Sequence, residues 1–215
     1  MIYLSGTFTN IPKDKKGDFG YMLNVMRQIG GEREAMEYPW MLDNGAFGDK
    51  WNIKTWQARL SVLSVNLFKC IGTVAPDVVG NSKATRQRWD QLSYIPKKMG
   101  YKVFYATQDG CTVDEIPWGE IDGLFVGGSN QHKEVDSFPL IREAKDRGFW
   151  VHVGRVNSPT KIRKFCAADS VDGTRFVFDS NRRTINGILR GVRFCNQVDH
   201  GQLSFLDSLQ QHTQL

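Results

Sequence analysis

The chain has 215 residues, of which 40% are hydrophobic and 24% are charged. This is an ordinary composition for a globular protein, and the length suffices for one domain with a sizeable core. We expect a single domain over residues 1–199 and a peripheral, glutamine-rich tail over residues 200–215. A net charge of +5 and a pI near 9.0 favour a polyanionic partner such as nucleic acid, although many basic proteins bind none.

The sequence gives no sign of secretion, membrane insertion or metal binding. No stretch approaches the ~20 apolar residues of a membrane span, and the first residues do not resemble a secretory leader, which predicts a cytoplasmic protein. The four cysteines, Cys70, Cys111, Cys166 and Cys195, form no Cys-x-x-Cys pair and have no histidine at ligand spacing. We therefore expect reduced thiols, with neither a zinc site nor a disulfide framework.

Predicted strands and helices alternate along the chain. Strands are expected at residues 2–5, 40–42, 72–79, 101–106, 123–128, 150–153 and 168–171. Helices are expected at residues 21–29, 55–68, 82–99, 136–147 and 184–195, and Ser158-Pro159 opens a further one in the favoured cap-then-proline order.

This alternation predicts an α/β fold with a parallel sheet. Seven strands in one domain favour a (β/α) barrel of the TIM type over an open doubly wound sheet. The eighth strand is not evident, and residues 176–178 are one candidate, so the expected barrel is compact and irregular or incomplete. A barrel of this type has its active site at the C-terminal ends of its strands.

Polar or glycine residues stand at the ends of most of the predicted strands. They are Asp43, Asp77, Gln108, Gly127, Gly128, Gly154 and Asp172. Asp43 and Asp172 each end a short apolar run and precede a turn, an arrangement that delivers a carboxylate to the mouth of a pocket and suggests acid/base or nucleophilic chemistry. The alternative is that each aspartate only caps its turn, because Asp-Gly and Asp-Asn are common turn formers.

In chain order, these strand ends resemble the tRNA-guanine transglycosylase superfamily, and more closely its DNA-acting branch, the 7-deazaguanine DNA transglycosylases. The resemblance runs from about residue 40 to residue 172. Its segments are Leu42-Asp43-Asn44-Gly45-Ala46-Phe47, Val74-Ala75-Pro76-Asp77, Thr107-Gln108-Asp109-Gly110, Val126-Gly127-Gly128, Val153-Gly154 before Ser158-Pro159, and Ala168-Asp169-Ser170-Val171-Asp172.

The resemblance implies a role for each matching residue. Asp172 would be the nucleophile that traps C1′ of the sugar, and Asp43 would be the general acid and base. Asp77 would accept N1–H and the 2-amino group of a guanine-type base. The other residues expected to bind the substrate are Gln108 and Gly128 as donors to O6, Phe47 and Val153 as the two faces of a sandwich around the flipped base, and Gly127 and Gly154.

The same resemblance implies the partners. The chain lacks the Cys-x-Cys-x-x-Cys zinc subdomain of the tRNA-acting enzymes and is much shorter, which favours DNA over tRNA and a compact form such as bacteriophages carry, acting in the host cytoplasm. No metal and no organic cofactor is expected; the second substrate would be a free 7-deazaguanine base. Basic residues that follow strand ends are expected to meet phosphates: Lys83, Arg86, Arg155, Arg175, Arg182 and Arg183. For any one of them, a solvated helix face is the alternative.

Two other functions stay open at this point. The same carboxylates would serve a hydrolytic glycosylase, in which water resolves the intermediate. A catalytically idle barrel that binds nucleic acid or a protein through its basic face would need none of them.

Overall fold

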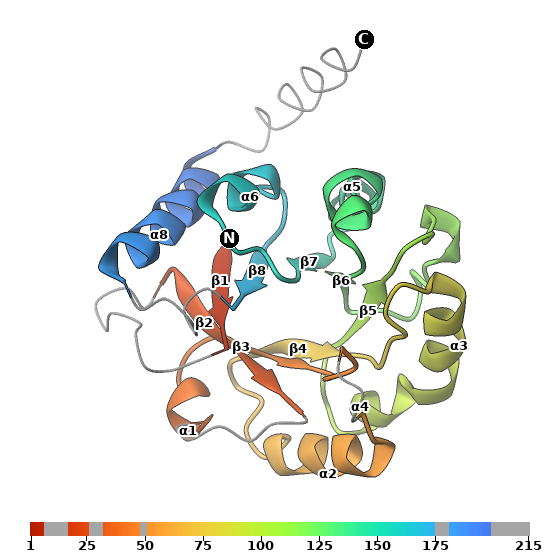
Figure 1. Ribbon diagram of the computed structural model, residues 1–215. Helices are drawn as coiled ribbons and strands as arrows, with labels where there is room; N and C mark the ends of the chain where they lie inside the picture. Colours follow the sequence, from red (N-terminus) through yellow and green to blue (C-terminus); the bar gives the residue numbers. More distant parts are fainter. Residues whose placement is uncertain (7–16, 26–31, 48–50, 175–180, 199–215) are drawn as a thin grey trace.

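Eight parallel strands close into a barrel, and helices lie around it (Figure 1). This computed structural model describes residues 1–6, 17–25, 32–47, 51–174 and 181–198, without the side chain of Arg182. Each strand pairs in parallel with the next, and β1 pairs with β8 to close the ring. The strands are β1 (Ile2–Ser5), β2 (Phe19–Asn24), β3 (Trp40–Asp43), β4 (Cys70–Val74), β5 (Val103–Thr107), β6 (Gly123–Val126), β7 (Trp150–Val153) and β8 (Ser170–Gly173).

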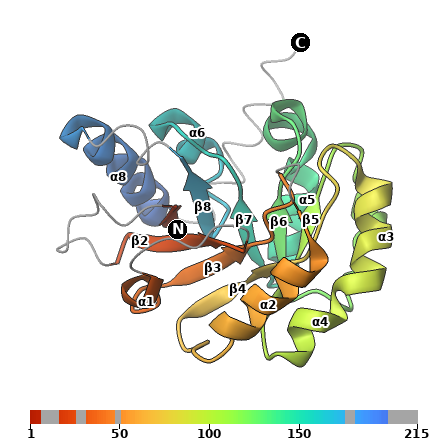
Figure 2. The ribbon, with the colours of Figure 1, turned by 60° about the horizontal axis from the view of Figure 1, so that its bottom comes forward.

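The helices differ widely in length. They are α1 (Glu32–Ala35), α2 (Ile53–Leu63), α3 (Ser82–Leu92), α4 (Tyr94–Lys98), α5 (Phe138–Asp146), α6 (Pro159–Lys164) and α8 (Arg182–Gln197), with a 3₁₀ turn η2 (Val113–Glu115) and a π-helical turn η3 (His132–Asp136). Ser158 caps α6, since its hydroxyl accepts from the N–H of Lys161, as the Ser-Pro pair predicts. Figure 2 shows α6 and α8 side by side, with β8 next to them.

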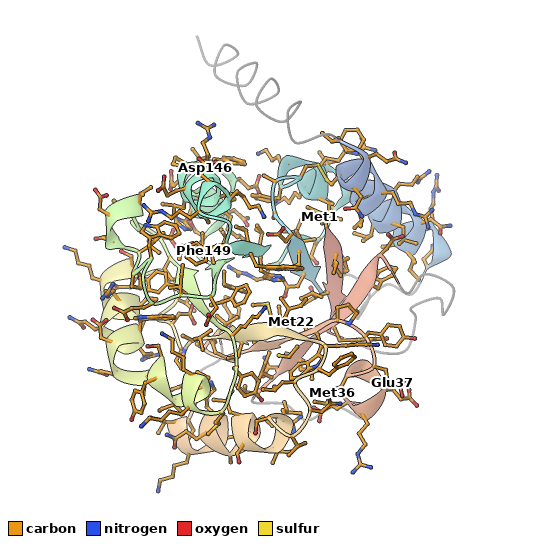
Figure 3. All side chains as sticks on the ribbon, turned by 180° about the vertical axis from the view of Figure 1, so that it is seen from behind. Met1, Met22, Met36, Glu37, Asp146 and Phe149 are labelled. Atoms are coloured by element: carbon orange, nitrogen blue, oxygen red, sulfur yellow. A yellow bond between two sulfur atoms is a disulfide. The ribbon has the colours of Figure 1, made fainter. Side chains whose placement is uncertain are left out.

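The alternation of side chains along the strands divides the core into two parts. Inside the ring, Leu4, Met22, Met41, Val74, Phe104 and Ala106 form one buried cluster. The larger cluster fills the space between the ring and the helices and includes Trp40, Trp56 and Trp89. Figure 3 shows side chains filling both spaces.

The first predicted helix, at residues 21–29, is wrong where the structure describes it. Residues 19–24 are β2, which is buried on both faces of the sheet. Parallel strands of this kind carry continuous apolar runs that periodicity does not separate from a buried helix. Gly20 is the informative residue, because a Cβ there would lie 2.1 Å from the carbonyl oxygen of Pro39.

With β2 counted as a strand, the ring is complete. The incomplete barrel allowed by the sequence is therefore corrected to a closed one. Residues 176–178, the candidate for the eighth strand, and residues 200–215, the expected tail, lie outside the described residues. The predicted helix over residues 82–99 is divided into α3 and α4, and that over residues 136–147 begins later, after η3.

The prediction of four reduced thiols is also wrong. Cys166, just after α6, and Cys195, in α8, form a disulfide across a sequence separation of 29 residues, while Cys70 and Cys111 are free. Scattered cysteines that are far apart in sequence meet because α6 and α8 pack together, which spacing alone does not reveal. Across the described helices, none combines the length and apolar character needed to cross a membrane.

Candidate active site

A pocket opens at the C-terminal end of the barrel. Its lining brings together residues from segments that are far apart in sequence: Asp43, Asn44, Phe47, Asp77, Val79, Gln108, Phe125, Gly127, Gly154, Arg155 and Asp172. Of the residues expected to be catalytic or to bind the substrate, all but Gly128 and Val153 are in this lining.

Strand alternation explains why these positions meet. Every second residue of a strand faces the inside of the barrel, so the residue two places after an interior core residue forms the next layer up. Met41 leads in this way to Asp43, and Ala106 leads to Gln108. The apolar layer below therefore supports a polar layer on which a ligand can rest.

Asp43 lies at the end of β3, beside two other carboxylates. Asn24 Nδ2 donates to its Oδ2 at 2.9 Å. Burial raises the pKa of Asp43 to about 7, and the charges of Asp172 and Asp77 contribute in the same direction. A carboxyl group with this pKa exchanges a proton near neutral pH, as a general acid and base must.

Asp77 is buried and held by two amides. Asn44 Nδ2 donates to its Oδ1 at 2.9 Å, and Gln108 Nε2 donates to its Oδ2. Burial raises the pKa of Asp77, although these hydrogen bonds act in the opposite direction. Gln108 is fixed in turn by the N–H of Gly80, which donates to Oε1 at 2.9 Å. The two amides set the plane of the carboxylate.

Asp172 enters the pocket from β8. The backbone N–H of Arg155 donates to its Oδ1. Below it, inside the barrel, Nε2 of the fully buried His152 lies 3.8 Å from the same oxygen and has no hydrogen-bond partner among the described residues. The other ring nitrogen of His152 is 2.9 Å from the hydroxyl of Ser170. Asp172 is thus oriented from one side by a backbone donor and sits above a histidine that the sequence did not place in the site.

Two glycines leave room for the side chains that line the pocket. A Cβ on Gly127 would lie 2.6 Å from Gln108 Nε2, and one on Gly154 would lie 2.9 Å from the ring of Phe125. Gly128 adopts a positive φ of 73° just above Gly127 but lies outside the pocket lining. Any side chain at Gly127 would displace the amide that holds Asp77.

The aromatic residues differ from expectation in one respect. Phe47 lies at the mouth with 68% of its surface exposed, and the Arg155 guanidinium lies 4.6 Å from the centre of its ring. Val153 instead points away from the barrel interior into the outer core, because the alternation of β7 places His152 and Gly154 inward. Phe125 lines the pocket instead, and its ring stacks on that of His152 with 5.1 Å between the ring centres.

The predicted basic residues are spread more widely. Arg155 lines the pocket and donates to the carbonyl of Gly128 at 2.5 Å; with φ of 59° it is held in a conformation unusual for arginine. Lys83 is exposed on α3, and Arg86 on the same helix pairs with Asp90 at 3.0 Å. Arg183 is exposed on α8, of which Arg182 is the first residue, and Arg175 lies outside the described residues.

Neither the models of known protein families nor the curated proteins match this chain. Within the described ranges, no three His, Cys, Asp or Glu side chains gather closely enough to hold a metal ion.

Proposed function

We propose that this protein is a base-exchange transglycosylase that replaces guanine in DNA with a 7-deazaguanine through a covalent aspartyl-glycosyl intermediate. The observation that supports this most directly is the meeting of Asp43, Asp77 and Asp172 in one pocket, with the pKa of Asp43 near 7. Each carboxylate has a different environment, which suits three different tasks.

The first displacement breaks the bond between guanine and C1′. A carboxylate oxygen of Asp172 attacks C1′, the electron pair of the glycosidic bond goes to the guanine, and protonated Asp43 supplies the proton that the leaving base takes up. The transition state is oxocarbenium-like, so the negative charge of Asp172 stabilises it.

The second displacement reverses these roles. Ionised Asp43 takes the proton from N9 of the incoming 7-deazaguanine, N9 attacks C1′, and the carboxylate of Asp172 leaves. Two inversions at C1′ retain the anomeric configuration. Asp43 gives one proton to the departing guanine and recovers one from the incoming base, so neither metal nor organic cofactor enters the proposed cycle.

Recognition of the base is assigned to Asp77 and Gln108. The two oxygens of Asp77 would accept N1–H and the 2-amino group of a guanine-type base, and adenine, which lacks this pair of donors, would leave the carboxylate unsatisfied. Gln108 Nε2 has a second hydrogen beyond the one given to Asp77, and this would reach O6. Phe47 is placed to stack on a base taken out of the helix.

The test is to look for the intermediate itself. Wild-type protein incubated with guanine-containing DNA is expected to yield a protein–DNA conjugate that survives denaturation and is mapped by mass spectrometry to Asp172. Asp172→Asn keeps the oxygen that accepts from Arg155 and should give none. A conjugate at another residue, or free guanine released with no conjugate and no exchange, would contradict the proposal; release alone would favour the hydrolytic glycosylase.

A further inference from the structure

A second pocket lies beside the candidate active site and shares Arg155 with it. It is lined by Asn130, Lys133, Arg155, Asn157, Ser158 and Lys161. No carboxylate is among these residues, and three of the six are cationic. Of the six, only Arg155 was expected from the sequence to contact a ligand.

Lys133, in η3, is the unusual member of this lining. Only 4% of its surface is exposed. Among the described residues, its Nζ donates one hydrogen bond, at 3.2 Å to the carbonyl of Gly154, and makes no ion pair. An ammonium group has three donors, and a buried charge without a counter-charge is costly. Among the described residues, the buried ammonium group of Lys133 therefore has no counter-charge.

The neighbouring charges do not supply that partner. Glu134, the residue after Lys133, is engaged by Lys161 at 2.5 Å and by Lys164 at 3.2 Å. Asp172 stabilises the charge of Lys133, but burial and the charge of Arg155 outweigh it and lower the pKa of Lys133 to about 8. The guanidinium of Arg155 contacts a carbonyl and an aromatic ring. An anion in the pocket would meet both cations at once.

The position of the pocket indicates which anion. Lys133 bonds to Gly154, which lines the candidate active site, and Arg155 donates its N–H to the nucleophile Asp172. The two pockets therefore adjoin each other at Gly154 and Arg155. In a nucleic acid strand, the anionic groups nearest to the sugar on which Asp172 would act are the phosphates that adjoin that sugar.

We propose that this pocket binds, through the charges of Lys133 and Arg155, a backbone phosphodiester next to the nucleoside that occupies the active site. The identification of that nucleoside rests on the proposed function. Binding of the phosphate would fix the sugar relative to Asp172 and would distinguish a strand from a free nucleoside.

The test asks whether the charge of Lys133 and the charge of the phosphates beside the nucleoside affect binding through the same contact. The affinity of a short single-stranded oligodeoxynucleotide with a single deoxyguanosine is measured for wild type and for Lys133→Met. Both measurements are repeated with an oligonucleotide in which neutral methylphosphonate links flank the deoxyguanosine. Each change alone is expected to weaken binding about tenfold or more, and the two together no further than one alone. The slope of log affinity against log salt should shrink by about 0.7 in the variant.

Matched controls separate charge from structure. Lys133→Gln keeps a donor for the Gly154 carbonyl but no charge, and should behave as Lys133→Met does. Lys98→Met removes an exposed cation on α4 and should leave the affinity for the oligonucleotide and its salt dependence unchanged. Because a buried charge is removed, Lys133→Met should be at least as stable to heat as wild type.

Three results would overturn the inference: additive effects of the two changes, unchanged binding by Lys133→Met, or full binding by Lys133→Gln. A site for free phosphate would show as Lys133-dependent thermal stabilisation by inorganic phosphate without coupling to the oligonucleotide links, which also overturns it. Base exchange plays no part in these measurements. Loss of exchange with intact coupling would therefore refute the proposed function alone, and exchange without coupling would refute the phosphate site alone.

Discussion

Replacing Asp43 by asparagine tests the electrostatics of the site most sharply. The folded protein holds the pKa of Asp43 at about 7, against 3.8 for an aspartate fully exposed to water. Between these two pH values the folded state keeps a proton that the unfolded chain has released. The free energy of unfolding should therefore fall as the pH rises through this window, and the loss is complete above about pH 7.

The size of the effect follows from the shift. At ~1.4 kcal/mol for each pKa unit, ionised Asp43 costs the folded state about 4 kcal/mol relative to low pH. This value is an upper figure, since the side chain is only partly buried and water at the pocket mouth screens its charge. Asp43→Asn does not titrate, so the stability of the variant relative to wild type should rise by up to that amount between pH 4 and pH 8.

Urea denaturation at a series of pH values measures this difference. Comparing the variant with wild type at each pH removes the titration of groups far from the site, and Asp114→Asn provides an amide substitution at an exposed position as a control. The same variant should lose about 10²–10⁴ in the rate of base exchange. A stability difference between Asp43→Asn and wild type that stays constant from pH 4 to pH 8 would refute the assignment of Asp43 as the proton-exchanging group.

Three further predictions concern single contacts. Gly127→Ala places a Cβ 2.6 Å from Gln108 Nε2 and should raise the KM for guanine-containing DNA at least about tenfold. The control Gly119→Ala, at a position with open space around it, should leave the KM unchanged. Equal KM values for the two variants would contradict the role of Gln108. Phe47→Ala should leave the melting temperature nearly unchanged, because the ring is exposed, but should weaken oligonucleotide binding by about 1–3 kcal/mol if a base stacks there; unaltered affinity would exclude stacking. Cys166→Ala should lower the free energy of unfolding by about 3–4 kcal/mol and abolish any effect of reductant on the melting temperature; a wild-type melting temperature that does not respond to reductant would speak against the disulfide.

The barrel was predictable because most of its strands are short apolar runs that end in a polar residue or glycine. β2 was not, because it is buried on both faces and its pattern is that of a helix. The error hid Asn24, which bonds to Asp43, and left the predicted barrel one strand short of the closed ring.

The part of the site that is made of residues at the C-terminal ends of strands was predictable from the sequence. Asp43, Asp77, Gln108 and Asp172 meet as expected, because the C-terminal ends of parallel strands share one rim. Val153 was expected on the inner face of β7 but lies on the outer face, because neighbouring residues of a strand point to opposite sides of the sheet. The partners that orient the carboxylates, such as Asn44 and His152, depend on contacts between strands, and Lys133 on the packing of a π-helical turn, which no local pattern shows.

The most direct test of the central claim is base exchange itself. Guanine-containing DNA is incubated with radiolabelled free guanine and the protein, and label is followed into the polymer, with Asp172→Ala as control; guanine serves as donor so that the natural 7-deazaguanine need not be known. The account predicts label in DNA with wild type and none with Asp172→Ala. Absence of label in DNA with wild type, or equal label with the variant, would contradict it.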